Sequence, residues 1–181
     1  MKKVLLLGVA LLLIASVTSA QLPPQGYIGL YADGDHVNGC AVGVVFVPFY
    51  CFVLPPEGGM DSVEFSTTLG TGVAGVMNLV VNPDIILTMG SVPGDYVATF
   101  GSCQGAWTEV FHADAYVPSD VEPSFIYMGA HSLNDYPLIL TCDIIETEAL
   151  ISTDLHVNDA DCTDPVAAKE STWGAIKNMY E

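Results

Sequence analysis

Hydrophobic and polar residues alternate along several stretches of the chain with a period of two. In Met60–Leu69 the side chains of Val63, Phe65, Thr67 and Leu69 fall on one side, and serine, glutamate and threonine fill the positions between them. Such alternation is typical of a strand with one buried face and one solvated face. Two later stretches repeat the pattern: 111–117 and 151–157.

Other stretches are continuously apolar, which favours strands that are buried on both faces. They are Tyr27–Tyr31, Val42–Leu54 and Leu138–Cys142. Clusters of the turn-forming residues Pro, Gly, Asn and Asp separate the apolar stretches, at 55–59, 82–84, 93–95 and 134–137. About eight to ten short strands at this spacing predict an all-β fold, which we expect to be an antiparallel β-sandwich in preference to a barrel.

Residues 1–20 have the three parts of a secretory signal peptide. Lys2 and Lys3 form the charged start, Val4–Ala15 forms the apolar centre, and small residues lead to Ala20. A centre of about a dozen residues is too short to cross a hydrocarbon core of roughly 30 Å, so we prefer a signal peptide to a membrane anchor. We expect cleavage before Gln21, export to the periplasm or beyond the cell, and no membrane span in the mature chain.

The mature chain divides into a sandwich domain, 21–164, and a C-terminal tail, 165–181. Within the tail Trp173, Ile176 and Tyr180 recur at the spacing of one helix face, which predicts a short helix. Such a short helix is marginal in isolation and must dock on something. Trp and Tyr are common interface anchors. We therefore expect Trp173, Ile176, Lys177 and Tyr180 to contact either the chain's own domain or a partner, which would be a protein or a cell-surface component.

The charge of the chain is strongly acidic. There are 21 acidic residues against four basic ones, and the formal net charge is −17. Lys2 and Lys3 belong to the signal peptide, so the mature chain keeps only Lys169 and Lys177, and it has no arginine. Nucleic-acid binding needs cations at the phosphates and is excluded. The acidity fits either a well-solvated surface or a surface that binds cations.

Five cysteines follow the signal peptide, and an exported protein meets an oxidising compartment. An odd number allows two disulfides and leaves one thiol over, with many arrangements open. Among these we favour a Cys40–Cys162 bridge, which would close the domain at its ends, and a Cys103–Cys142 bridge.

Calcium is the first candidate ligand. Asp33 and Asp35 follow the first predicted strand, while Asp159, Asp161 and Asp164 follow the last. Calcium takes six to eight oxygen ligands, and alternate carboxylates on a loop can supply several of them. The alternative is that Asp simply favours turns.

Two further arrangements of side chains could form sites. His112 with Asp114, and Asp154 with His156, would supply zinc-like ligands if their two strands were neighbours. Trp107 sits beside a turn and could stack on a sugar ring, as could Tyr136. The chain has no Gly-x-Ser-x-Gly nucleophile motif, and no catalytic residue can be assigned.

Several segments also resemble a group of small secreted bacterial proteins that has no established activity. They are 26–33, 98–103, 157–162 and the Trp-Gly-x-Ile-Lys tail within 170–180. The stretch 52–69 is similar to the early strands of cohesin-like and immunoglobulin-like sandwiches. The resemblance implies export and a sandwich fold.

These observations favour a secreted, non-catalytic binding or adhesion module, or an extracellular matrix module. The first alternative is a calcium-dependent carbohydrate-binding domain, whose partner would be a glycan. The second is a secreted hydrolase.

Overall fold

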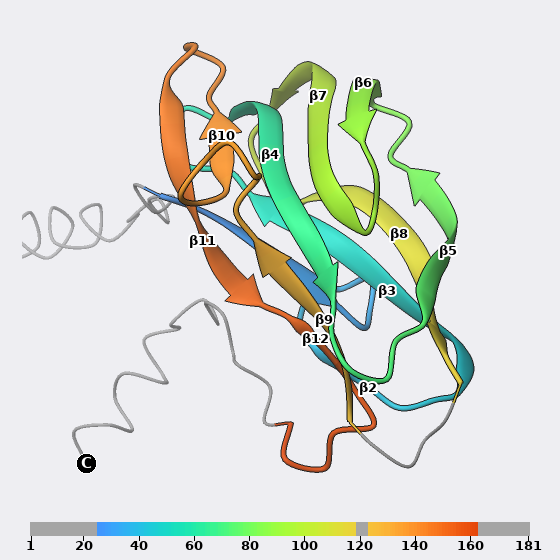
Figure 1. Ribbon diagram of the computed structural model, residues 1–181. Helices are drawn as coiled ribbons and strands as arrows, with labels where there is room; N and C mark the ends of the chain where they lie inside the picture. Colours follow the sequence, from blue (N-terminus) through green and yellow to red (C-terminus); the bar gives the residue numbers. More distant parts are fainter. Residues whose placement is uncertain (1–24, 119–122, 163–181) are drawn as a thin grey trace, which may run out of the picture.

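The computed structural model describes residues 25–118 and 123–162, and these residues form twelve strands (Figure 1). The strands are β1 (Gly26–Tyr31), β2 (Cys40–Ala41), β3 (Val45–Leu54), β4 (Met60–Leu69), β5 (Gly75–Val81), β6 (Ile85–Gly90), β7 (Gly94–Gln104), β8 (Thr108–Val117), β9 (Ser124–Gly129), β10 (Leu138–Leu140), β11 (Glu146–Thr153) and β12 (Leu155–Val157). The all-β class expected from the sequence is therefore confirmed.

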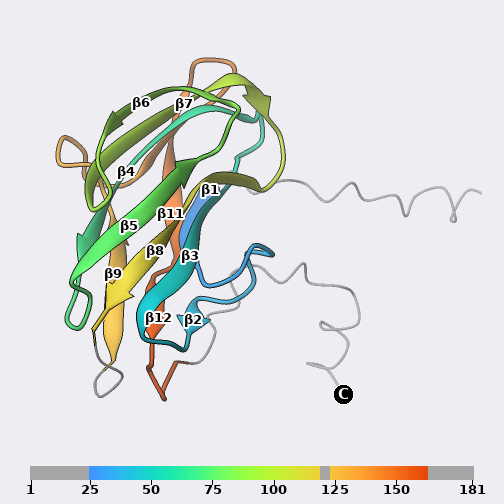
Figure 2. The same cartoon turned by 90° about the vertical axis from the view of Figure 1, so that its right-hand side faces the viewer.

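The strands lie in two layers that face each other across the core (Figures 1 and 2). The first layer has the order β11–β1–β3–β8–β5. In the second layer β6 pairs with β7 and β7 with β4. The other edge of β4 pairs with β10 near its start and with β9 near its end, and β12 and β2 continue outward from β9.

Strand β11 belongs to both layers and joins them. Its first residues, 146–148, pair with β10, and the residues from Ala149 onward pair with β1. The hydrogen-bonded path therefore runs through all the strands of the structure without a break, with β6 and β7 branching from β4.

The expectation of a purely antiparallel sandwich is wrong at two strand pairs. β1 pairs with β11 in parallel, and β2 pairs with β12 in parallel. Both pairs bring the beginning of the domain beside its end. Parallel neighbours cannot be joined by a tight hairpin, and each of these pairs is connected instead by most of the domain.

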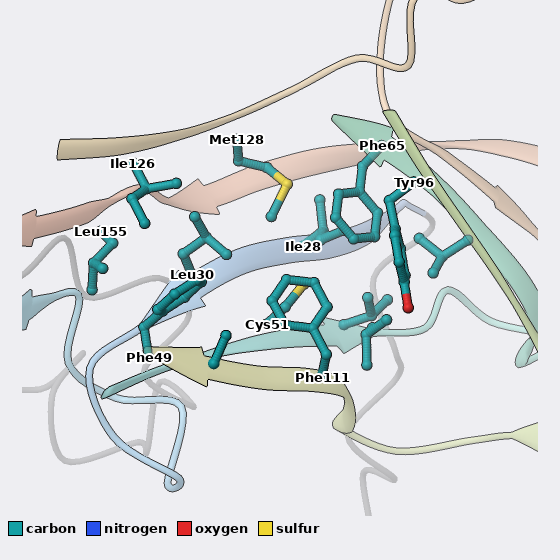
Figure 3. Packing of buried hydrophobic residues seen from close by; sticks show 14 of the residues in the cluster. Ile28, Leu30, Phe49, Cys51, Phe65, Tyr96, Phe111, Ile126, Met128 and Leu155 are labelled. Atoms are coloured by element: carbon teal, nitrogen blue, oxygen red, sulfur yellow. The ribbon is translucent and has the colours of Figure 1, made fainter. Parts of the chain in front are cut away.

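The core lies between the two layers and includes inward-facing residues of the alternating stretches that the sequence analysis named (Figure 3). On β4, Val63 and Phe65 are completely buried and Thr67 is almost so. On β8 the alternation is equally regular, since Phe111, Ala113, Ala115 and Val117 all point inward. Rings from both layers meet here: the Phe111 centroid lies 6.3 Å from that of Phe65.

The apolar runs behave less uniformly than expected. Strand β1 is buried along nearly its whole length, as predicted. Strand β3 is buried on both faces only toward its end, and near its start Phe46 is 52 % exposed. In the last alternating stretch Ile151 is 42 % exposed although Thr153 is buried, and the pairing of β11 with β1 shifts its register between these two residues.

The described residues contain no helix, and so none that could cross a membrane. The predicted signal peptide, 1–20, and the predicted C-terminal helix within 165–181 lie outside the described residues.

Candidate functional site

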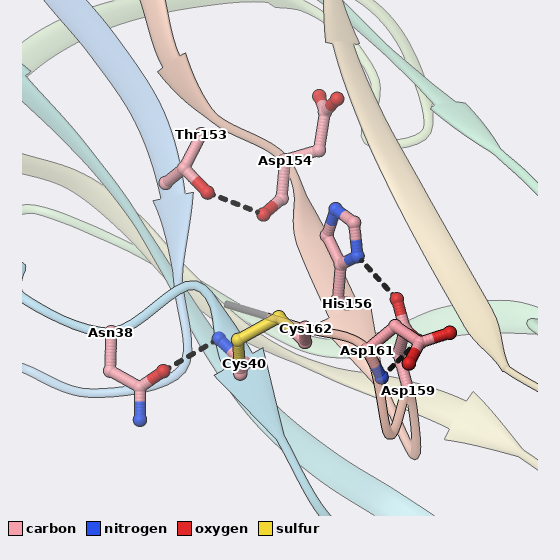
Figure 4. Close-up of polar contacts among 8 residues, drawn as sticks. All are labelled: Asn38, Cys40, Thr153, Asp154, His156, Asp159, Asp161 and Cys162. Carbon is pink, nitrogen blue, oxygen red and sulfur yellow. Dashed lines mark hydrogen bonds and ion pairs between the residues drawn. A yellow bond between two sulfur atoms is a disulfide. The ribbon is translucent and has the colours of Figure 1, made fainter. Parts of the chain in front are cut away.

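The structure forms two disulfides, and they are the pairs that the sequence analysis favoured. Cys40 of β2 is bonded to Cys162, which lies beyond the end of β12 (Figure 4). Cys103 of β7 is bonded to Cys142 after β10. Cys51 is the free thiol among the described cysteines and is completely buried. Burial raises the pKa of the Cys51 thiol, and the nearby Glu109 adds to this effect. The buried thiol is therefore shielded from oxidants and metals.

Two of the aspartates predicted to bind calcium accept hydrogen bonds from nearby backbone N–H groups in two turns. The Asp33 carboxylate accepts the backbone N–H groups of Asp35 and Val37, at 3.1 and 3.2 Å. The Asp159 carboxylate accepts the N–H of Asp161 at 3.1 Å. In 25–118 and 123–162 no group of three or more His, Cys, Asp or Glu side chains is placed to hold a metal ion. Asp164 lies outside the described residues, and calcium binding stays a prediction.

The hypothesis of a zinc-like site shared by two strands is wrong, because those strands are not neighbours. His112 lies on β8 in the first layer, whereas His156 lies on β12 in the second. Each histidine instead pairs with a carboxylate three residues away: His112 Nδ1 lies 2.6 Å from Glu109, and His156 Nδ1 lies 2.9 Å from Asp159. The hydrogen bond from His156, followed by that from the Asp161 N–H, lowers the pKa of Asp159.

Trp107, one of the two candidate sugar-stacking residues, is part of a packed cluster on the outer side of the first layer. The ring of His36 stacks on it, with centroids 4.5 Å apart and planes 27° apart. Tyr31 meets the same indole edge-on at 6.0 Å, and Phe52 lies 5.2 Å from His36. One face of Trp107 is therefore covered by protein. Tyr136 is 43 % exposed and keeps its place as a candidate.

The most exposed apolar strands are β5 and β6, which are consecutive in the chain and lie at one edge of the sandwich (Figure 2). Strand β5 belongs to the first layer and β6 to the second. Within the described residues, β5 pairs only with β8, and β6 pairs only with β7. Each strand therefore leaves one side of its backbone open. Between 39 % and 72 % of each of six apolar residues here is exposed: Met77, Leu79, Val80, Ile86, Leu87 and Met89. We call this surface the β5/β6 edge.

The β5/β6 edge was not predicted from the sequence, although the chain carries a signal for it. Asp84 is the only charged residue between Glu64 and Asp95, in a protein that is otherwise rich in carboxylates. An apolar segment with so little charge is equally compatible with strands that are buried on both faces, so its composition alone does not indicate an exposed edge. Only the strand order shows that these two strands lie at the edge.

A second group of rings lies on the outer side of the other layer. Phe125 and Tyr127 of β9 are stacked, with centroids 5.8 Å apart and planes 8° apart. His156 of the neighbouring strand β12 meets Phe125 edge-on at 5.0 Å. Cys40 lies directly opposite His156 on β2. We call these four residues the β9–β12 strip. The tail residues Trp173, Ile176, Lys177 and Tyr180 lie outside the described part of the chain.

No family model matches this chain, and no curated protein matches it. Among solved structures, a non-cellulosomal cohesin from the hyperthermophilic archaeon Archaeoglobus fulgidus is 8 % identical over 76 % of this chain and 94 % of its own, with a TM-score of 0.50. The CaCohA2 module in a complex with a CaDoc0917 variant is also 8 % identical, over 74 % of this chain and 98 % of its own, with a TM-score of 0.52. At these identities the likeness concerns the fold. The chain is thus an all-β domain with a cohesin-like fold.

Proposed function

We propose that this protein is a non-catalytic protein-binding module, and that the β5/β6 edge is the surface that contacts the partner. One observation carries the proposal. On a domain with an excess of carboxylates, two consecutive strands that end their layers expose apolar side chains and carry no charge.

An open strand edge is a template for pairing, and natural proteins usually protect it with lysine, proline or a covering segment. Neither β5 nor β6 contains a charged residue or a proline. A partner that covers the exposed side chains gains about 25 cal/mol for each Å² of apolar surface removed from water. It can also satisfy the unpaired backbone groups by adding a strand. Both gains favour a protein or peptide partner.

The fold supports a binding role. The CaCohA2 module, which shares it, was solved in a complex with CaDoc0917. Export also fits the proposal, since residues 1–20 have the pattern of a signal peptide and the domain has two disulfides. The partner would then be an extracellular, periplasmic or cell-surface protein.

The test compares the immobilised chain, residues 21–181, with a variant that carries Leu87→Lys and Met89→Lys. Secreted and surface proteins of the native cells are passed over both, and the retained proteins are quantified by mass spectrometry. A protein retained by the wild type is then purified, and its Kd is measured by calorimetry. We expect the double variant to bind at least about tenfold more weakly, the effect of losing about 1.4 kcal/mol at an interface.

The matched control is Val42→Lys with Leu133→Lys, which adds the same charge at two apolar side chains that are 92 % and 85 % exposed in connecting loops. This variant should bind like the wild type. The proposal fails if both double variants lose the partner equally, or if the wild type retains nothing that the edge variant releases.

A further inference from the structure

The cations of this protein are separated from its folded body. The described residues, 25–118 and 123–162, contain neither lysine nor arginine. Outside the predicted signal peptide, the only lysines are Lys169 and Lys177, in the segment that follows Cys162. The carboxylates of the body therefore have their only matching strong bases in the C-terminal tail.

Cys162, the last described residue before the tail, has a fixed place. The disulfide to Cys40 holds Cys162 against β2, at the end of the second layer (Figure 4). Cys40 lies opposite His156, and His156 lies opposite Phe125 in the next strand. Leu155 and Val157 are completely buried, so His156 points away from the core, as does the half-buried Cys40 beside it. Cys162, which precedes the tail in the sequence, thus lies at one end of the β9–β12 strip.

The strip offers an apolar surface of rings. Tyr127 is 43 % exposed although its ring is stacked on Phe125. Gly70 lies close beneath this pair, since a Cβ atom there would come within 2.6 Å of the Tyr127 ring and 3.0 Å of Phe125 Cβ. Both side chains therefore lie close to the Gly70 backbone, and the Tyr127 ring remains partly exposed. Rings held in this way are a preformed platform for another aromatic side chain.

Carboxylates border the same surface. Asp159 and Asp161 lie beside the disulfide, and Asp159 is paired with His156 (Figure 4). Asp154 precedes β12, and its carboxylate accepts the backbone N–H of Met128 on β9 at 2.7 Å. The apolar rings match Trp173, Ile176 and Tyr180. The carboxylates match Lys169 and Lys177, whose charge is balanced within the segment 165–181 by Glu170 and Glu181.

We propose that residues 165–181 dock on the β9–β12 strip of their own chain. Trp173 contacts Phe125 and Tyr127, and the lysines lie beside Asp154, Asp159 and Asp161. The geometry allows it: two strand spacings, about 10 Å, separate Cys40 from Phe125, whereas the stretch from Cys162 to Trp173 reaches about 16 Å as a helix and roughly 36 Å when extended.

Docking of the tail on its own chain is favoured over docking on a second copy of the protein, for two reasons. A short tether gives the attached tail an effective concentration of the order of millimolar, and two strongly acidic bodies repel each other. The inference does not depend on the proposed function, because the strip and the β5/β6 edge lie on different strands. Substitutions at Leu87 and Met89 should leave the tail docked.

The first experiment uses a zero-length carbodiimide cross-linker on residues 21–181, as an equal mixture of unlabelled and ¹⁵N-labelled chains. Apart from the N-terminal amine, every amine of the chain 21–181 belongs to the tail. We expect Lys177 to be joined to Asp154, Asp159 or Asp161, in peptides that carry a single isotope. Mixed-isotope peptides would assign the tail to a second copy, and links to Glu109 or Asp114 of β8 would place it on the other layer. Either result overturns the proposal.

The second experiment measures the rate at which hydroxyl radicals oxidise Trp173, by mass spectrometry. Tyr127→Ala removes a ring from the strip, and we expect the oxidation rate to rise about fivefold, as for the loss of one aromatic pair. Tyr136→Ala is the matched control, because Tyr136 is also 43 % exposed but lies in the loop between β9 and β10. The inference is wrong if Trp173 of the wild type reacts as fast as in the isolated 165–181 peptide, or if the two variants behave alike.

Discussion

At the residue scale, a single histidine in the loop after β1 packs its ring against the aromatic cluster on the outer side of the first layer. His36 has a left-handed backbone, with φ of 49°, and its ring stacks on Trp107. Burial lowers the pKa of His36 from its usual value of 6.5, although the nearby Asp33 and Asp35 act in the opposite direction. The folded state therefore prefers the neutral ring.

This preference predicts a pH dependence of stability. As the pH falls below about 6.5, the unfolded chain binds a proton at His36 before the folded chain does. The free energy of unfolding should then decrease until the pH reaches the lowered pKa of the folded state. We expect the His36→Asn variant, whose side chain tolerates a left-handed backbone, to lose less stability than the wild type between pH 7.5 and 5.5. Urea unfolding at the two pH values measures this, and equal losses in both proteins would contradict it.

At the element scale, the parallel contact between the first strand and β11 depends on a close approach of their backbones. Gly29 of β1 faces Ser152 of β11, and an added Cβ would collide with the Ser152 hydroxyl oxygen. That hydroxyl is hydrogen-bonded to the Tyr31 hydroxyl at 2.7 Å and donates to the Ile28 carbonyl at 3.1 Å. The absence of a side chain at position 29 therefore preserves these bonds.

Gly29→Ala should force the two strands apart and lower the free energy of unfolding by about 1–3 kcal/mol, the usual cost of overpacking. Gly75→Ala in β5 is the control, because a Cβ there would have no neighbour within 4 Å. Chemical unfolding of both variants provides the comparison. If Gly29→Ala is no less stable than Gly75→Ala, the close approach has no energetic importance.

The sequence predicted individual elements well where one face is buried. Over most of β4 and β8 every second residue enters the core, and this period is visible without a structure. The sequence did not predict the burial of β3 correctly, because its continuous apolar run suggested burial on both faces whereas Phe46 is exposed. Composition alone does not distinguish an apolar residue in the interior from one at an uncovered surface.

At the scale of the whole molecule, the disulfides connect segments that are distant in sequence. The Cys40–Cys162 bridge joins residues 122 positions apart, and the Cys103–Cys142 bridge joins residues 39 positions apart. A cross-link that closes a longer loop removes more entropy from the unfolded chain. The chain-entropy model gives about 5 kcal/mol for the first bridge and about 4 kcal/mol for the second.

Replacing both cysteines of one bridge by alanine tests this order. Cys40→Ala with Cys162→Ala should lower the free energy of unfolding more than Cys103→Ala with Cys142→Ala, as measured by guanidinium unfolding without reductant. A thiol titration is the control for connectivity. Because Cys51 is buried, the native wild type should show no reactive thiol, and the unfolded chain should show one. The reverse order of stabilities would contradict the entropic argument.

The sequence by itself determined the all-β class, the strands with one buried face, and the strong acidity of the chain. These properties depend on local period and composition, which neighbouring residues already specify. Only the tertiary structure decided that β1 lies beside β11, that His112 and His156 lie in different layers, and that β5 and β6 form an uncovered edge. Strand order depends on which distant segments bury each other's apolar surface, and this choice is made by the whole chain at once.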